Sequence, residues 1–194
     1  MNDDSQDPVE RLLDVATGTA DLAIMAARKN AAKQVTGADI SEGMLKHGRL
    51  KVKDARLAER VELVRADSAA LPFADGAFDA VTVAFGARNF EDLERGLREM
   101  LRVLAPGGRL FVLEFSKPRG TVMGALFRFY FHRVMPFVGS LVSRDSAAYT
   151  YLPESVDAFP DGERFLHILE RSGGREARLR TLTGGIATIY SVTR

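Results

Sequence analysis

Short apolar runs alternate with stretches of helical periodicity along most of this chain. Such alternation is typical of βαβ units, in which a helix connects two parallel strands. The pattern predicts five strands of this kind, over residues 11–16, 34–40, 61–67, 78–85 and 109–115. It predicts helices over residues 21–32, 41–57, 91–104 and 163–171. Together these elements predict a doubly wound sheet whose strands are mostly parallel.

Two more strands are predicted near the C-terminus, over residues 177–182 and 186–192. Gly184 and Gly185 lie between them and suit a hairpin-type junction. We expect these strands to pair antiparallel, with the last one inserted beside the fifth. The predicted fold is therefore α/β and Rossmann-like, a mostly parallel seven-stranded sheet with an antiparallel C-terminal strand. A length of 194 residues suits one domain over residues 1–194.

Composition and charge narrow the classes of function. The net charge of +1 gives no sign of a nucleic-acid partner. The chain has no cysteine, which excludes a thiol nucleophile, a disulfide scaffold and a thiolate metal site. No cluster of His, Asp and Glu has metal-ligand spacing, so no metal is expected. The polar N-terminus is unlike a signal peptide, and no apolar run reaches about 18 residues. We therefore expect a cytoplasmic protein with residues 1–10 disordered.

The first predicted strand ends in a turn of small residues. Ala16, Gly18 and Ala20 would let the backbone approach a ligand at the carboxyl end of the strand, and the next helix would point its N-terminus at that ligand. Because only one of the three is glycine, this stretch alone fits an ordinary tight turn equally well. The candidate binding residues at this turn are Asp14, Thr17, Gly18 and Thr19.

Acidic residues end the next two predicted strands. Asp39 follows the turn by about 20 residues, where a carboxylate can accept hydrogen bonds from ribose hydroxyls. Asp39 could instead cap the following helix, but Ser41 is the better cap. Asp67 ends the third strand at the same edge of the sheet, where it could accept from an adenine amino group or simply occupy a surface turn. Three polar strand ends on one edge favour a nucleoside site.

The cofactor at such a site could be a dinucleotide or S-adenosylmethionine. A Walker P-loop is excluded, since the chain has no Gly-Lys-Ser/Thr sequence. An enzyme that transfers hydride would also have the glycine-containing turn after the first strand and the acidic residue that ends the second strand. Thr17 and Thr19 suit the phosphate-free cofactor S-adenosylmethionine better than a pyrophosphate.

Several longer segments resemble the ubiquinone/menaquinone biosynthesis C-methyltransferase family. The matching segments are residues 14–21, 70–73, 85–89 (Phe-Gly-Ala-Arg-Asn), 102–110, 113–118 (Leu-Glu-Phe-Ser-Lys-Pro) and 149–155. The segments at 85–89 and 113–118 are far more specific to the family than the cofactor turn, which all class I methyltransferases share. The resemblance extends from about residue 11 to the end of the chain and is greatest to bacterial demethylmenaquinone members.

This resemblance implies the class I fold, S-adenosylmethionine as cofactor, and C-methylation of a polyprenylated quinol, with demethylmenaquinol converted to menaquinol. It implies cofactor contacts from Thr19, Asp39, Ile40, Asp67 and Ser68. Arg88 and Asn89 fall in the segment that faces the quinol ring. There Arg88 could stabilise an oxyanion or hold the water that takes a proton. From the residues alone, Arg88 could instead cap a helix or pair with Glu91 or Asp92.

Two further regions bear on activity. Members of the family usually carry a few dozen residues before the first strand, which help to cover the active site, so we expect that lid to be missing here. Residues 119–160 are expected to form a cap on the substrate side. Its apolar part, 123–142, could hold the isoprenoid tail, touch the inner face of the cell membrane, or pack as a helix pair. Methylation of another small molecule, or cofactor binding without catalysis, are the alternatives left open, as is the oligomeric state.

Overall fold

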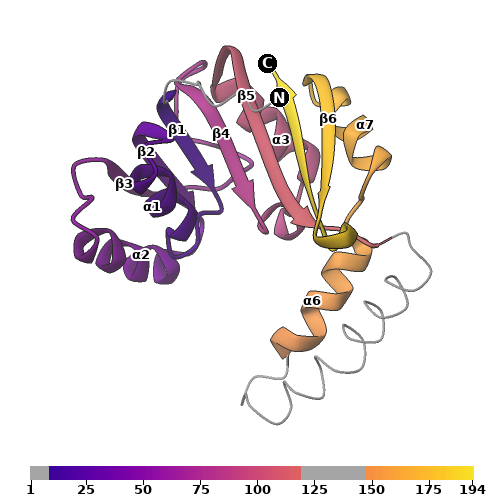
Figure 1. Ribbon diagram of the computed structural model, residues 1–194, viewed down its shortest axis with the longest axis horizontal. Coiled ribbons are helices and arrows are strands. Elements are labelled where there is room, and N and C mark those ends of the chain that lie inside the picture. The colour runs from indigo at the N-terminus through magenta and orange to yellow at the C-terminus, as the bar shows by residue number, and fades with distance from the viewer. Residues whose placement is uncertain (1–8, 119–146) are drawn as a thin grey trace.

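The computed structural model describes residues 9–118 and 147–194 (Figure 1). The predictions for residues 1–8 and for the apolar part of the cap, 123–142, lie outside these described residues. A correction applies at the N-terminal boundary, because residues 9 and 10 belong to the first strand rather than to a disordered arm. Val9 is held there by pairing with Ala32 of the second strand.

The described residues form one seven-stranded sheet in the order β3-β2-β1-β4-β5-β7-β6. The strands are β1 (Val9–Val15), β2 (Ala32–Asp39), β3 (Val61–Arg65), β4 (Phe78–Ala84), β5 (Leu104–Phe115), β6 (Arg175–Leu182) and β7 (Ala187–Thr193). The first five are parallel, whereas β7 pairs antiparallel with both β5 and β6. The predicted fold is confirmed, including insertion of the last strand beside the fifth.

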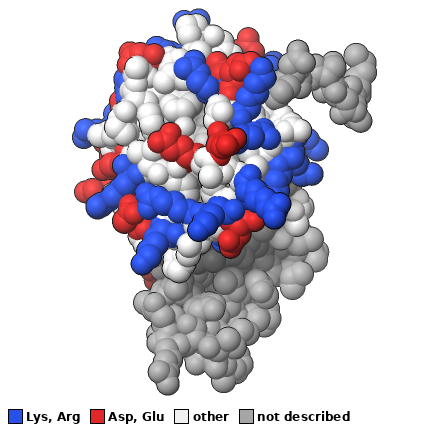
Figure 2. All heavy atoms as spheres, turned by 90° about the vertical axis from the view of Figure 1, so that its left-hand side faces the viewer, with Lys and Arg blue, Asp and Glu red and all other residues white. Residues whose placement is uncertain are grey.

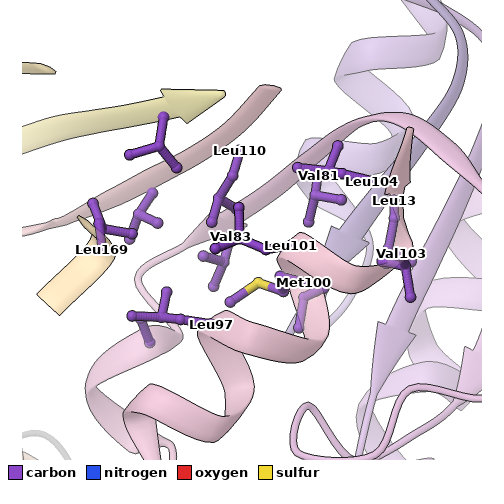
Figure 3. Close-up of a cluster of buried hydrophobic side chains, with 14 of the residues drawn as sticks. Leu13, Val81, Val83, Leu97, Met100, Leu101, Val103, Leu104, Leu110 and Leu169 are labelled. Carbon is purple, nitrogen blue, oxygen red and sulfur yellow. The ribbon is translucent and has the colours of Figure 1, made fainter. Parts of the chain in front are cut away.

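Helices cover the sheet on both faces. They are α1 (Asp21–Arg28), α2 (Glu42–Asp54), α3 (Leu93–Val103) and α7 (Glu163–Arg171). Helix α6 (Ala147–Ala158) instead contacts the short 3-10 turn η1 (Ala87–Asn89) and extends beyond the end of the sheet (Figure 1), and a second 3-10 turn is η3 (Thr183–Gly185). Helix α1 and part of α2 pack on β1–β3 in one apolar cluster. Helices α3 and α7 pack on the opposite face in a larger cluster. Figure 3 shows this cluster, in which Leu97 and Met100 of α3 meet Val81 and Val83 of β4.

Helix α3 shows how the sequence produces this packing. Leu97, Met100 and Leu101 recur at helical spacing, are at most 5% exposed, and place one apolar face on the sheet. Burying such side chains stabilises the fold by about 1.5–3 kcal/mol each. The Asp92 side chain accepts a hydrogen bond from the Arg95 amide at 2.9 Å and so begins the helix. The cap and the apolar face together fix where this helix starts and how it lies.

Other boundaries differ from the predictions. Helix α1 ends at Arg28, four residues early, because Asn30 adopts a left-handed conformation and the chain then enters β2. Strand β5 begins at Leu104, five residues before the predicted start at 109, and runs through a Pro-Gly-Gly sequence. Helix α6, inside the predicted cap, was not predicted by the hydrophobic pattern. Ser41 caps α2 as predicted, accepting from the Met44 amide at 3.3 Å. No helix among the described residues is long and apolar enough to cross a membrane.

Candidate active site

The carboxyl ends of β1 to β4 meet at one edge of the sheet, at the bottom in Figure 1. In parallel α/β sheets this edge is where ligands bind. Strand order reverses between β1 and β4, since β2 and β3 lie to one side and β5 to the other. The predicted site residues all follow the ends of these strands, so the fold brings them to one region.

The turn after β1 has an unusual backbone. Ala16, Gly18 and Ala20 all have positive φ, at 53°, 56° and 66°. For a non-glycine residue this conformation is unfavourable by about 1 kcal/mol or more. Two hydrogen bonds hold the turn, from the Thr17 amide to the Ala38 carbonyl at 3.0 Å and from the Ala20 amide to the Thr17 carbonyl at 2.9 Å. Tertiary contacts thus impose a conformation that the small side chains only permit.

Asp14 lies beneath this turn and is 1% exposed. Its two carboxylate oxygens accept hydrogen bonds from the Thr17 hydroxyl at 2.6 Å and the Thr82 hydroxyl at 2.9 Å. Burial raises the pKa of Asp14 to about 6, although both hydroxyls oppose that shift, and the nearby charge of Asp39 raises it further. In this position Asp14 ties the turn to β4 from below rather than facing a ligand.

Asp39 holds the same turn from the side. One carboxylate oxygen accepts from the Gly18 amide and the other from the Ser41 amide, each at 2.8 Å. Each oxygen can accept a further bond, so the half-buried carboxylate can still receive ribose hydroxyls. Ile40 follows with 63% exposure, which leaves an apolar side chain at the edge of the site.

The other three predicted cofactor residues, Asp67, Ser68 and Thr19, differ in exposure and in hydrogen-bond partners. Asp67 is exposed, and its side chain accepts from the Ala69 amide at 2.8 Å. Ser68 is half-buried and faces the start of α3 near Gly96. The Thr19 hydroxyl bonds Asp21 and Lys51 at 2.8 and 2.7 Å, on the side where α1 meets α2. Of these groups, the Asp67 carboxylate remains the most accessible acceptor.

Two glycines bring the strand-end loops into contact. A Cβ at Gly86 would lie 2.5 Å from the Ala16 Cβ, so the segment after β4 rests directly on the turn after β1. A Cβ at Gly37 would lie 2.9 Å from the Thr17 side chain. Real Cβ atoms do not approach this closely. Glycine at position 86 therefore lets the segment carrying Arg88 adjoin the turn after β1, and glycine at position 37 of β2 leaves room for the Thr17 side chain.

Arg88 pairs with Glu114, an interaction that the sequence did not predict. The Arg88 Nη1 atom donates to the two Glu114 carboxylate oxygens at 2.9 and 3.3 Å, and also to the Phe85 carbonyl. The side chains are 12% and 0% exposed. Asp92, one of the expected partners, instead caps α3. Asn89 follows at the exposed end of η1.

Aromatic rings surround this ion pair. The Phe85 ring, 37% exposed, lies 4.6 Å from the Phe115 ring between centroids. The Arg88 guanidinium carbon is 5.4 Å from the Phe115 centroid, within range of a cation–π interaction. Burial raises the pKa of Glu114, while Arg88 and the Phe115 amide act in the opposite direction. The segment after β4 therefore combines an exposed apolar ring with a buried, compensated cation.

The hydrogen-bonding groups at this edge fit a nucleoside that carries a positive charge. Asp39 and Asp67 offer acceptors for hydroxyl and amino groups. Carboxylates near the turn also favour a positively charged group such as a sulfonium. No group of His, Asp and Glu in the described part of the chain suits a metal ion. Two hollows among the described residues, of about 610 and 290 Å³, include none of the predicted site residues.

A family model and several curated relatives match this chain. The model of the ubiE/COQ5 methyltransferase family matches residues 1–194. Demethylmenaquinone methyltransferase of Bacteroides fragilis is 47% identical over 185 residues, covering 95% of this chain and 76% of the relative. Demethylmenaquinone methyltransferase of Thermus thermophilus is 51% identical over 181 residues, covering 93% of this chain and 81% of the relative. A ubiquinone/menaquinone biosynthesis C-methyltransferase of Geotalea uraniireducens is 48% identical, covering 93% and 77%.

Solved structures share the fold at lower identity. The [4+2]-cyclase SpnF superimposes with a TM-score of 0.75 at 23% identity, covering 97% of this chain and 76% of its own. A putative methyltransferase from Bacillus halodurans gives a TM-score of 0.69 at 19% identity, covering 98% and 94%. At this identity the likeness supports the architecture alone.

Proposed function

Because this chain belongs to the ubiE/COQ5 methyltransferase family, we propose that it methylates a ring carbon of demethylmenaquinol and so produces menaquinol. The chain is a methyltransferase, and its cofactor is S-adenosylmethionine. The names of the relatives from Bacteroides fragilis and Thermus thermophilus support the choice of substrate. The observation that carries the proposal is the contact of Gly86 with Ala16. This contact places the segment that carries Arg88 against the turn after β1.

Cofactor binding is assigned to the β1–β3 part of the edge. Asp39 would accept from the ribose hydroxyls, and Asp67 from the adenine amino group, with Ser68 beside it. Ile40 would cover a face of the adenine with its exposed side chain. Thr17, Gly18 and Thr19 would surround the amino-acid portion, with Asp14 holding their turn in place. When bound, the cofactor supplies a methyl group on a positively charged sulfur.

Substrate chemistry is assigned to the β4–β5 part. Methylation of a ring carbon requires electron density from a quinol oxygen, which rises when that hydroxyl gives its proton to water. The ring carbon then releases its own hydrogen to water as a proton when the methyl group replaces it. The Arg88 cation can stabilise the resulting oxyanion, and Asn89 lies next to it to orient the ring. Phe85 and Phe115 provide an apolar wall for an aromatic substrate. Most of the enzyme's contribution is then positioning and exclusion of water.

The proposal is tested by incubating the protein with methyl-labelled S-adenosylmethionine and demethylmenaquinol. The expected product is menaquinol carrying the label on a ring carbon, identified by mass analysis of fragments. Demethoxylated benzoquinol precursors and small phenols serve as alternative acceptors. Labelling of one of those acceptors with none on demethylmenaquinol would refute the assigned substrate, and a lack of cofactor binding would refute the assigned edge.

A lipophilic quinol also implies contact with the membrane surface at its cytoplasmic face. On the side shown in Figure 2, Lys and Arg side chains gather in a band. Helix α2 lies on this side and exposes Lys46, Arg49 and Lys53 together with Leu50, which is 56% exposed. Vesicles containing anionic lipid should bind the protein, and Lys46→Glu with Lys53→Glu should weaken binding by about 1 kcal/mol per charge. Equal binding to neutral vesicles would contradict this role.

A further inference from the structure

Glu114 is a buried carboxylate on β5, with apolar residues before it and the buried hydroxyls of Ser116 and Thr188 beyond it. It follows Leu110 and Val112 on the same face of β5, and all three side chains are 0% exposed. Transferring an ionised carboxylate into such surroundings is unfavourable by several kcal/mol unless it is paired and hydrogen-bonded. Even then, an apolar residue of similar size is often as stable or more stable. Stability alone therefore gives no reason for glutamate at this position.

The partners of Glu114 point to a role for its charge. One oxygen accepts from Arg88 Nη1 at 2.9 Å, and the other accepts from the Phe115 amide at 3.0 Å. The Arg88 side chain is itself only 12% exposed. The carboxylate thus compensates a guanidinium held at the end of β4, beside the turn that Gly86 contacts.

The Arg88 side chain is held through one nitrogen, which leaves several of its hydrogen-bond donors without a partner among the described residues. A bidentate pair would donate from two nitrogens, whereas among the described residues the bonds to Glu114 and to the Phe85 carbonyl all come from Nη1. The Arg88 Nε atom is buried and has no hydrogen-bond partner among the described residues. A buried donor without a partner is unfavourable by about 1–3 kcal/mol. This arrangement suits a guanidinium placed for a ligand better than one placed for stability.

We propose that Glu114 is a positioning residue for methyl transfer, which holds Arg88 by Nη1 so that Nη2 can serve an oxyanion of the substrate. This inference rests on the proposed function. Glu114 does not touch the substrate, because it lies behind Arg88 with no exposed surface. Its removal would free the guanidinium to leave the site or to turn its remaining donors toward the Phe85 carbonyl.

A double-mutant cycle tests this coupling. Glu114→Gln keeps the shape of the side chain and removes its charge, and is expected to lower kcat by about 10–100-fold, as for other residues that orient an active group. The dissociation constant of S-adenosylmethionine should stay within about threefold. Adding Glu114→Gln to Arg88→Ala should cause no further loss of kcat, because the two residues act as one unit. Glu91→Gln, an exposed acid nearby, is the matched control and should leave kcat unchanged.

Outcomes of this cycle are decisive in both directions. Glu114→Asp keeps the charge with a shorter reach and should give a kcat between those of the wild type and Glu114→Gln. Full kcat in Glu114→Gln, or losses from Arg88→Ala and Glu114→Gln that simply multiply, would overturn the proposal. Thermal unfolding of each variant identifies any that fail to fold, and Glu114→Asp then carries the comparison.

A second measurement does not depend on activity. The Arg88 Nε–H resonance, assigned by its loss in Arg88→Lys, should exchange slowly with water in the wild type because the atom is buried. In Glu114→Gln the exchange should be at least about tenfold faster, the scale expected when local opening becomes easier by about 1.4 kcal/mol. Unchanged exchange would overturn the positioning role. Altered exchange in a protein that does not methylate demethylmenaquinol would instead refute the proposed substrate alone.

Discussion

The two parts of the sheet edge present charge in opposite ways. At β1–β3, the Asp39 and Asp67 carboxylates lie at or near the surface and bond mainly to backbone amides. At β4–β5, the Arg88 and Glu114 charges are buried, bonded to each other, and flanked by aromatic rings. Surface carboxylates suit reversible binding of a polar cofactor, since water can replace the ligand. A buried pair suits a reaction that needs a fixed cation in a dry site.

The largest effect is expected from removing the cation of the buried pair. Arg88→Ala should lower kcat by about 10²–10³-fold, equivalent to about 2.7–4 kcal/mol, the usual effect of deleting a donor to an oxyanion. Affinity for S-adenosylmethionine should change little, because the cofactor residues lie on the other strands. Steady-state kinetics with demethylmenaquinol and calorimetry with the cofactor separate these two quantities. Arg109→Ala, at an exposed position on β5, is the control. An equal loss of kcat in Arg88→Ala and Arg109→Ala would contradict a specific role for the buried pair.

Asp14 is the exception within the β1–β3 part, because it is buried, and its effect should appear in the pH dependence of stability. Its pKa of about 6 in the folded protein exceeds the usual 3.8, so the fold favours the protonated form. The contribution to stability is complete below about pH 3.8 and is lost as pH rises through 6. A shift of about two pH units corresponds to about 3 kcal/mol.

Asp14→Asn should remove this dependence. The free energy of unfolding of the variant, measured relative to that of the wild type in denaturant, should rise by up to about 3 kcal/mol between pH 4 and pH 7. Titration of other groups cancels in this difference. A difference that stays constant across the range would show that Asp14 is not held as the structure indicates.

Asp39 tests whether the exposed carboxylates bind the cofactor. Asp39→Ala should weaken S-adenosylmethionine binding by roughly 1–3 kcal/mol, the scale of a hydrogen bond to a charged group. Part of the loss would come through the turn, since the Gly18 amide also loses its acceptor. Calorimetry measures the affinity, and Glu62→Ala, an exposed acid on β3, is the control. Unchanged affinity in a folded Asp39→Ala protein would refute the assignment.

The contact between the two parts is the last and smallest test. Gly86→Ala would place a Cβ 2.5 Å from that of Ala16 and force the two loops apart. We expect a loss of stability of about 1 kcal/mol, at the low end for overpacking, with weaker cofactor binding and lower kcat together. Gly43→Ala, in the exposed first turn of α2, lacks such a contact and should be neutral or stabilising. A decrease in cofactor affinity alone, or in kcat alone, would show that the β1–β3 and β4–β5 parts of the edge act independently.

The fold followed from local signals in the sequence. The alternation of apolar runs with helical periodicity specified five parallel strands, and Gly184-Gly185 indicated the closing hairpin, because secondary structure and turn chemistry depend on neighbours along the chain. The position of Asp39 at the end of β2 was predictable for the same reason, whereas Asp67 lies just beyond the end of β3 rather than in it. Helix and strand ends were less so, as at Asn30, where a left-handed residue ended α1 early.

Tertiary structure alone decided which side chains meet. Glu114 lies 26 residues beyond Arg88, and nothing in the local pattern distinguishes it from an outward-facing residue of β5. Only the side-by-side pairing of β4 with β5 brings the carboxylate to the end of β4. Likewise, each of two carboxylates has one partner that is distant along the chain, the Gly18 amide for Asp39 and the Thr82 hydroxyl for Asp14. The sequence determined where polar groups could gather, whereas packing determined which became surface acceptors and which became a buried ion pair, because burial is a property of the assembled layers.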